Sequence, residues 1–201
     1  MALTKVKVGG IEPYLGGRRN IVINGAMQVA QRATSATGLG ASAGYFTVDR
    51  YNSVSNTSGR FTMSQSTVTD LPGFANALKL DCTTADTSIA ADEYFLLQYK
   101  LEGQNLQRFA KGTSSAEKMT VSFYVKGNAN ATYVCELYDQ DNAREIAQTF
   151  SVTSSWQRVV LTYDGDTTGT FDDDNVLSMY ISFWLHAGSN HNSGTLSTTW
   201  T

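Results

Sequence analysis

The chain has 201 residues, which is enough for one domain with a sizeable hydrophobic core and too few for two domains of ordinary size. Charged residues make up only 16% of the chain, and no apolar run approaches the roughly 20 residues that a membrane-spanning helix needs, so membrane insertion is excluded. The formal net charge is -3, which leaves no global positive field to hold a phosphate backbone, so nucleic acid is not an expected partner.

The first segment, residues 1–44, is predicted to be an N-terminal docking or oligomerisation arm that ends in a hinge. Residues 1–20 hold four basic side chains against the single acid Glu12, and glycine pairs and Pro13 punctuate them. Such a segment has little capacity to build its own core. It is therefore either a disordered terminus or a docking peptide that becomes ordered on a partner or on sister chains.

Two short pieces complete this segment. Residues 20–33 suit a short strand with a turn at Asn24-Gly25 better than a helix. Residues 35–44 combine small residues with three glycines and carry no periodic pattern, which is typical of a flexible loop or hinge.

Residues 45–201 are predicted to form an all-β domain, a jelly-roll β-sandwich preceded by the extended arm. Apolar segments recur at the spacing of an antiparallel sandwich, with polar or glycine-containing turns between them. They cover 44–54, 59–68, 76–84, 93–103, 118–127, 131–139, 147–165 and 176–188. A short helical turn is predicted only within 101–112.

Period-two alternation separates the best strands into two faces. The face assigned to the core between two sheets consists of Val121, Phe123 and Val125, then Tyr133, Cys135 and Leu137, then Leu177, Met179, Ile181, Phe183 and Leu185. The opposite face carries more aromatic residues than a solvated sheet usually does. Two sheets packed through such a core describe a jelly roll.

The outward aromatic residues predict a carbohydrate-binding face. Sugars lay their apolar C–H faces on tyrosine or tryptophan rings, while polar side chains hydrogen-bond the hydroxyl groups. The predicted binding residues are Tyr124, Glu136, Tyr138, Tyr180 and Trp184. The alternative is that these rings are buried against a sister subunit.

The loop YDGDTTGTFDDDN, residues 163–175, is the candidate metal site. Its carboxylates are Asp164, Asp166, Asp172, Asp173 and Asp174. Calcium takes six to eight oxygen ligands from such groups, so a weakly held structural calcium is one interpretation. The other is a solvated acidic turn, and the spacing is not that of an EF-hand loop.

Catalytic residues and a disulfide framework are not expected. The only histidines, His186 and His191, lie at and inside a loop rich in glycine, serine and asparagine, so a catalytic triad is not predicted. Cys82 and Cys135 lie in apolar alternations and not in a metal-ligand spacing, which favours two buried free thiols over a disulfide.

Several motifs resemble the opening and later strands of bacteriophage virion proteins of the tail-fibre and tail-spike type. They are RNIVINGAMQVAQRATS (19–35), GYFTVDRYNSV (44–54), YKLEGQN (99–105), MTVSFYVKG (119–127) and FSVTSSWQRVVLTYDGD (150–166). The resemblance implies a jelly roll related to carbohydrate-binding modules, localisation in the virion, and a homotrimer. It also implies attachment through the arm to other virion proteins and contact with a host surface glycan. A head fibre or decoration protein of the same fold, and a polysaccharide-degrading enzyme, are the alternatives.

One departure from that family concerns the C-terminus. Domains of this type usually follow the loop corresponding to residues 186–201 with a further strand that closes the sandwich. An open sheet edge is a template for another chain, so a neighbouring subunit is expected to supply the closing strand if this chain does not.

Overall fold

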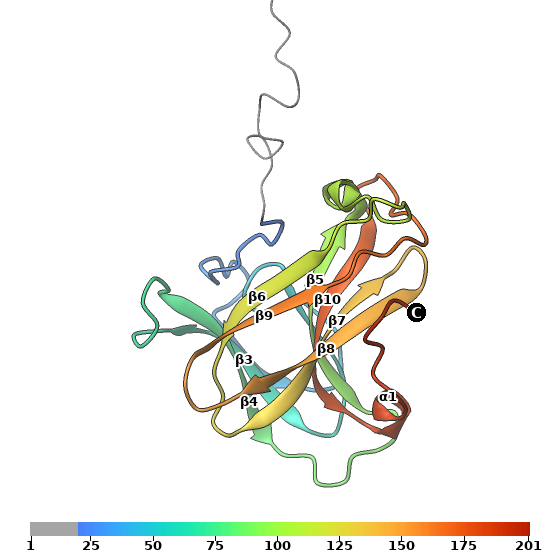
Figure 1. The fold of residues 1–201 in the computed structure, drawn as a ribbon. Helices are drawn as coiled ribbons and strands as arrows, with labels where there is room; N and C mark the ends of the chain where they lie inside the picture. Colours follow the sequence, from blue (N-terminus) through green and yellow to red (C-terminus); the bar gives the residue numbers. More distant parts are fainter. Residues whose placement is uncertain (1–19) are drawn as a thin grey trace, which may run out of the picture.

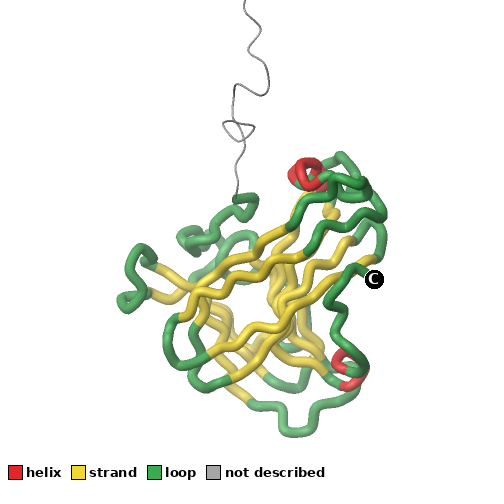
Figure 2. Tube along the Cα trace, in the orientation of Figure 1, coloured by secondary structure: helices red, strands yellow, loops and turns green. Residues whose placement is uncertain are grey.

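The alternating apolar pattern forms ten strands in the computed structural model, which describes residues 20–201 (Figure 1). The strands are β1 (Ser35–Leu39), β2 (Tyr51–Asn56), β3 (Arg60–Thr67), β4 (Asn76–Thr84), β5 (Tyr94–Glu102), β6 (Met119–Val125), β7 (Ala131–Asp139), β8 (Arg144–Val152), β9 (Gln157–Tyr163) and β10 (Leu177–Ala187). The helical pieces are η2 (Gly103–Asn105), η3 (Gln107–Phe109) and α1 (Ser189–Asn192), and none in the described part of the chain is long and apolar enough to cross a membrane (Figure 2). The predicted all-β class is confirmed.

The largest sheet is antiparallel and has the order β2-β5-β10-β7-β8. One register row crosses all five strands and is buried throughout; it consists of Tyr51, Tyr99, Ile181, Leu137 and Ile146. The next row holds Asn52, Gln98, Ser182, Glu136 and Ala147. Because successive side chains alternate across a strand, the first row faces the core and the second faces outward.

Two smaller sheets pack on the inner face of this sheet. Phe123 of the β6-β9 pair lies edge-on to Phe150 and Phe183 of the large sheet, with ring centroids 5.1 and 5.0 Å apart. Phe61 of the β1-β3-β4 sheet contacts Phe95 of β5 at 4.3 Å. The core therefore lies between the large sheet and two partial sheets. The core faces predicted for β6 and β7 are confirmed, and so are Met179, Ile181 and Phe183 of β10, whereas Leu177 and Leu185 do not belong to the core.

The predicted hinge at residues 35–44 is not a hinge. Residues 35–39 form β1, which pairs with β3, and Gly44 exchanges two backbone hydrogen bonds with Ser53 at the edge of β2. Small residues suit this segment because it lies against neighbouring strands: a Cβ on Gly40 would lie 2.3 Å from the carbonyl oxygen of Gly59. From residue 20 onward the segment is part of the β-sandwich, and the docking role predicted for residues 1–19 lies outside the described residues.

Residues 20–33 contain the predicted turn but no strand. The Met27 N–H donates to the Asn24 carbonyl at 3.0 Å, and Asn24 adopts a φ of 60°. The segment is held to the large sheet through Tyr99, whose hydroxyl accepts the Ile23 N–H at 2.7 Å. Asparagine tolerates the left-handed conformation that the turn requires, so the turn could be predicted, whereas the predicted strand is wrong.

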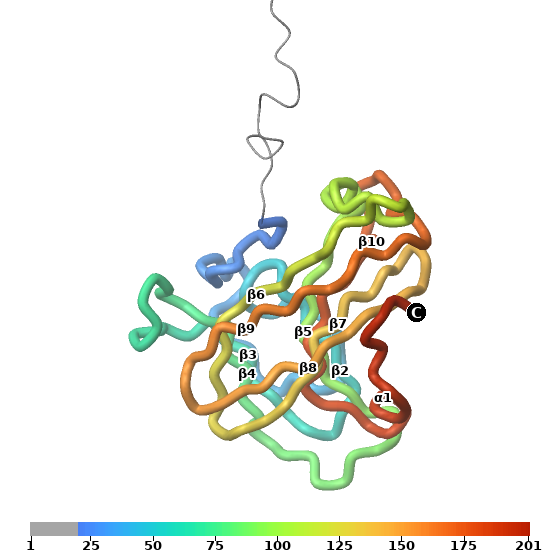
Figure 3. The backbone as a smooth tube through the Cα atoms, in the orientation of Figure 1, coloured from blue at the N-terminus to red at the C-terminus, as the bar shows by residue number. Residues whose placement is uncertain are grey.

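The chain's own C-terminal residues occupy the β8 edge, which was expected to be left for a neighbouring subunit (Figure 3). Glu145 and Thr201 exchange two backbone hydrogen bonds of 3.1 Å, and the Ala147 N–H donates to the Ser197 carbonyl at 2.7 Å. Trp200 packs on the core cluster and donates its ring N–H to the Asp164 carbonyl. Strand addition by a neighbour at these positions would have to displace this segment.

The cysteines are both free, and only one of them is buried as predicted. Cys135 is fully buried and Cys82 is exposed. Burial raises the pKa of the Cys135 thiol to about 12. Cys82 lies opposite Phe61 on the inward side of β4, but it comes after Leu78 and Leu80, near the end of the strand, and does not belong to the core cluster.

Candidate functional site

Four of the five predicted carbohydrate-binding residues lie together on the outward face of β7 and β10. In the antiparallel register Tyr180 is opposite Tyr138, Ser182 is opposite Glu136, and Trp184 is opposite Val134. We call this surface the aromatic face; it comprises Glu136, Tyr138, Tyr180 and Trp184 with Tyr94, Lys100 and His191, which join it from β5 and α1.

One end of the aromatic face is formed by tyrosines and a lysine. The rings of Tyr138 and Tyr180 are 6.2 Å apart and tilted by 48°. Lys100, opposite Tyr180 on β5, places its Nζ 5.7 Å from the centre of that ring and 5.8 Å from the centre of the Tyr45 ring. Two half-buried rings beside a cation form a platform on which an apolar sugar face can lie while the ammonium donates to its hydroxyl or carboxylate groups.

The other end is formed by Trp184, Tyr94 and His191. The His191 ring lies between the other two, with its centroid 5.1 Å from that of Tyr94 and 5.8 Å from that of Trp184. The Trp184 Nε1–H donates to Glu136 Oε2 at 3.1 Å. The indole is therefore fixed in place at the level of the acid, and Trp184 is half-buried.

Glu136 is the electrostatic centre of the aromatic face. Burial raises the pKa of its carboxyl group from 4.5 to about 7, a hydrogen bond from Trp184 opposes this, and the neighbouring Glu145 raises it further. Near neutral pH the group is therefore divided between its neutral and charged forms. It can donate a hydrogen bond as well as accept one.

Sequence reasoning missed several members of this surface. Tyr94 and Lys100 lie in a predicted strand, and their alternation with Phe95 and Tyr99 could have assigned them to the outward side. His191 comes from a loop whose path the sequence does not define. Glu145 lies in the segment between two predicted strands, and only the β7-β8 register places it beside Tyr138 and near Glu136.

Tyr124 does not belong to the aromatic face, which corrects the prediction. It lies on β6, where Phe123 points into the core toward β8 and β10, so Tyr124 points away from the large sheet. Its side chain is 42% exposed and contacts Phe74 with ring centroids 5.3 Å apart. Alternation had shown that Tyr124 faces outward, but it could not show from which of the two layers.

The acidic loop is not a gathered set of metal ligands either. Asp166 is buried and paired with Arg144 and Lys111, whereas Asp164 is exposed and paired with Lys118. Asp172, Asp173 and Asp174 are exposed, and Asp174 Oδ1 accepts the Val176 N–H within its own turn. Within residues 20–201 the only group of three close metal-ligating side chains lies elsewhere. A cation beside Asp166 would be repelled by the lysine and arginine already there.

The buried member of that loop has a structural role. Lys111 Nζ lies 2.6 Å from Asp139 Oδ2 and 3.1 Å from Asp166 Oδ2, and all three side chains are at most 3% exposed. Asp139 also accepts the backbone N–H groups of Asp141 and Asn142. This charge network joins η3, the β7-β8 turn and the acidic loop, so it organises one end of the sandwich.

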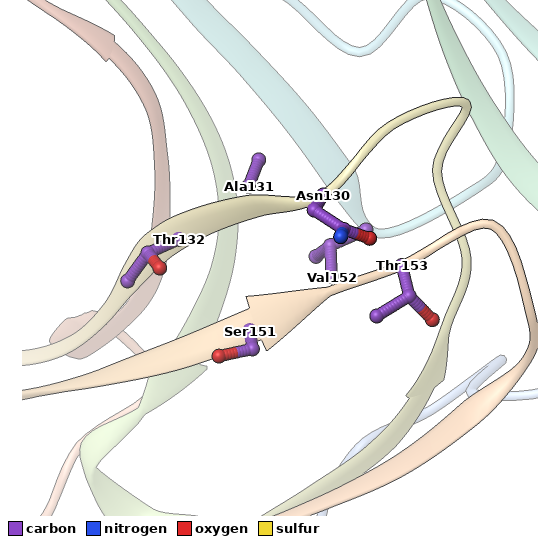
Figure 4. A pocket seen from close by; sticks show the side chains of 6 residues that line it. All are labelled: Asn130, Ala131, Thr132, Ser151, Val152 and Thr153. Atoms are coloured by element: carbon purple, nitrogen blue, oxygen red, sulfur yellow. The ribbon is translucent and has the colours of Figure 1, made fainter.

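A hollow of about 370 Å³ lies at the opposite end of β7 from Tyr138 (Figure 4). It is lined by Asn130, Ala131, Thr132, Ser151, Val152 and Thr153. These short side chains include no ring, no charge and no nucleophile with a base beside it. The hollow therefore offers less binding chemistry than the aromatic face.

The aromatic face thus combines stacking rings, a cation and a carboxyl group that can donate or accept. No protein-family model, no curated protein and no solved structure matches the chain. Such a surface can bind a polar ligand with apolar faces, for which a carbohydrate is the simplest example.

Proposed function

We propose that the chain is a virion structural protein, a phage tail-fibre or tail-spike subunit, whose β-sandwich is a jelly roll that binds a host surface glycan through the aromatic face. Residues 1–19 attach it to other virion proteins, and the subunit acts as a homotrimer. The motifs at 19–35, 99–105 and 150–166 support the virion role. The aromatic face supports the glycan.

The observation that carries the glycan proposal is the spacing of rings around Glu136. Trp184 and the Tyr138–Tyr180 pair lie on adjacent paired strands on either side of the Glu136–Ser182 row. A sugar lying across that row would have rings beneath its apolar faces and the Glu136 carboxyl group at its hydroxyls. Gln98 Nε2 donates to Ser182 Oγ at 3.2 Å, so a further amide is available in the same row.

Binding without cleavage is the activity that the carboxyl groups favour. Glu145 lies opposite Tyr138 on β8, close enough to Glu136 to raise the pKa of that carboxyl group. Glycosidases hold their two carboxyl groups apart, at about 5 to 9.5 Å, so that the scissile bond lies between them. We expect no new reducing ends when the protein is incubated with host capsule or lipopolysaccharide.

Affinity is expected to come from several copies. A shallow face gives a weak single site, and linking sites in a trimer raises avidity by roughly 10² to 10⁴ through effective concentration. The aromatic face lies on the side of the large sheet away from the two partial sheets, and in the proposed trimer three subunits present it together.

The decisive experiment compares two aromatic substitutions on opposite layers. Particles or purified trimers with Trp184→Ala should lose adsorption to host cells, because the indole on one side of the Glu136–Ser182 row is gone. Tyr124→Ala, which removes an exposed ring from β6, is the matched control and should adsorb normally. Circular dichroism of both variants should show the parent's fold.

Two outcomes contradict this proposal. Normal adsorption by the Trp184→Ala variant would place recognition elsewhere on the virion. Dissociation of the oligomer by the same substitution would show that the face is a subunit interface. Gold labelling of intact particles with an antibody to this chain separates a tail from a head location.

A further inference from the structure

A second cluster of polar side chains lies at the end of β10, beyond Trp184. The β10-β5 register shifts between Trp184 and His186, because Leu185 is an extra residue on β10. Trp184 is opposite Leu96, whereas His186 is opposite the buried Phe95. The bulge therefore turns His186 to the inner side of the sheet, away from the aromatic face.

His186 meets two carboxylates there, from the loop that joins β4 to β5. The ligand atoms of Asp86, Glu93 and His186 all lie within 4.8 Å of one another. Glu93 Oε2 is 3.9 Å from His186 Nε2. Two ligand atoms of a tetrahedral site with 2.1 Å bonds are about 3.4 Å apart. Side-chain rotations that bring the three ligand atoms from within 4.8 Å of one another to about that distance would close them around one ion.

A hydroxyl group completes the surroundings. Thr57 is buried, and its Oγ1 lies 3.4 Å from His186 Nε2 and 3.5 Å from Asp86 Oδ2. Oγ1 also accepts the Gly59 N–H at 3.1 Å, which fixes its position. It is placed to hydrogen-bond a water in a fourth coordination position.

The Glu93 carboxylate is held in place by the backbone. Oε1 accepts the Ser58 N–H at 2.9 Å, and Oε2 accepts the Ala90 N–H at 3.2 Å. Its own carbonyl accepts the Gly188 N–H at 2.7 Å, which ties the loop to the end of β10. Such outer hydrogen bonds orient a ligating carboxylate before the metal arrives.

The cluster lacks a compensating cation of its own. Within residues 20–201, no lysine or arginine forms an ion pair with Asp86 or Glu93, and His186 is the single basic partner. Glu93 is only 7% exposed. Two carboxylates this close repel each other unless a proton or a cation lies between them.

We propose that Asp86, Glu93 and His186 bind a divalent first-row transition-metal ion, with zinc as the representative, independently of the glycan-binding face. The His186 imidazole nitrogen decides which class of metal ion the site would bind. Calcium and magnesium prefer all-oxygen sites, whereas zinc accepts nitrogen and carboxylate ligands together. The ion joins the β4-β5 loop to the end of β10 and the turn after β2. Its role is structural, since the ligands come from two separate segments, the β4-β5 loop and β10, that it would hold together.

The test uses the full chain, freed of metal with a chelator and then titrated with zinc chloride. Binding to the native state at 100 times the Kd should lower the unfolding equilibrium constant about 100-fold, seen as a higher melting temperature. Asp86→Asn and His186→Gln should each weaken zinc binding by at least about tenfold. Asp92→Asn, in the same loop but outside the cluster, is the matched control and should bind like the parent.

Cobalt substitution gives a readout that does not depend on stability. Co²⁺ in the site should show visible absorption from a low-symmetry nitrogen and oxygen set, and His186→Gln should remove it. Zinc binding that is absent up to millimolar concentration, or unchanged in His186→Gln, overturns the proposal. Stabilisation by calcium and not by zinc would overturn the metal class. Circular dichroism of the metal-free variants, compared with the metal-free parent, shows whether they fold.

Discussion

Two carboxylate clusters lie toward opposite ends of β10 and are compensated in different ways. Near its start, opposite Met179, Asp139 shares Lys111 with Asp166, and every side chain in the trio is buried. Near its end, His186 is the one basic side chain of residues 20–201 that meets Asp86 and Glu93. The first cluster carries its own permanent cation, whereas the second has only an imidazole as its basic partner.

The difference shows why a count of acids in a loop does not predict a metal site. The loop richest in aspartate gives one residue, Asp166, to an internal ion pair and leaves the others in solvent. The group of side chains with metal-ligand spacing lies instead at Asp86, Glu93 and His186, where two carboxylates meet a histidine and form no ion pair with a lysine. Charge compensation within the fold, and not acid density, decides which carboxylates are left to bind a cation.

The largest expected effect is the loss of the permanent cation. Lys111→Met leaves Asp139 without its buried cation, while Asp166 keeps only Arg144, and removing one partner of a buried pair costs about 3–5 kcal/mol. Urea denaturation of this variant should show that loss in the free energy of unfolding. Lys118→Met breaks the exposed pair with Asp164 and should cost less than about 1 kcal/mol. Equal losses in the two variants would contradict the structural role of the network.

The next effect concerns Glu136, a carboxyl group that is compensated by a proton. Its pKa is raised from 4.5 to about 7 in the fold, so the native state binds the proton more tightly than the unfolded chain. That stability is fully present below pH 4.5 and is lost as the pH rises through 7, by up to about 3 kcal/mol. Glu136→Gln should remove this loss, measured by urea denaturation from pH 4.5 to 8.

Glu117→Gln, on an exposed residue, is the control for that series. Its profile of unfolding free energy against pH should follow that of the parent. A Glu136→Gln profile that falls as steeply as the parent's would mean that another group titrates in this range.

A smaller effect is expected when Asp166 loses Arg144, its second partner after Lys111. Burial alone would raise the pKa of Asp166, but hydrogen bonds from Arg144, the Thr168 N–H and Lys111 lower it below 3.8. A lowered pKa contributes stability that is present above 3.8 and is lost as the pH falls. Arg144→Met should cost about 2 kcal/mol at neutral pH and shift acid unfolding to higher pH. An unchanged acid midpoint would show that Lys111 alone sets this pKa.

The smallest effect is expected in the exposed part of the acidic loop. Asp173 lies in solvent, so Asp173→Ala should change the free energy of unfolding by less than about 0.5 kcal/mol. Millimolar calcium should leave the melting temperatures of parent and variant alike. A rise with calcium that Asp173→Ala abolishes would restore the loop as a metal site.

Local sequence was sufficient for the strands and their buried faces. Alternation from Met119 to Val125 and from Ala131 to Asp139 predicted both strands and the inward side of each, because a two-residue period is a property of the strand itself. The turn at Asn24 was also predictable from local sequence, because asparagine tolerates the left-handed backbone conformation that the turn requires. The predicted hinge at residues 35–39 was wrong because these residues pair with β3, and the predicted burial of Cys82 was wrong because the core does not reach it. Both outcomes depend on contacts with distant segments.

The candidate site divides in the same way. Glu136, Tyr138, Tyr180 and Trp184 were predicted because alternation turns them outward on their own strands, and the β7-β10 register then brings them together. Tyr124 has the same local pattern but belongs to the other layer. Glu145 lies at the start of β8 and His191 in α1, and no local pattern places either of them on this face.

The sequence by itself therefore determined the all-β class, the alternation of faces and the aromatic character of the outward side, since each depends on neighbours within a few residues. Only the tertiary structure decided strand order, which layer each strand joins and which charges meet. Those depend on contacts between distant segments, as when the extra residue at Leu185 turns His186 inward to Glu93. A one-residue shift reverses which face a side chain takes, and the composition of the strand does not record it.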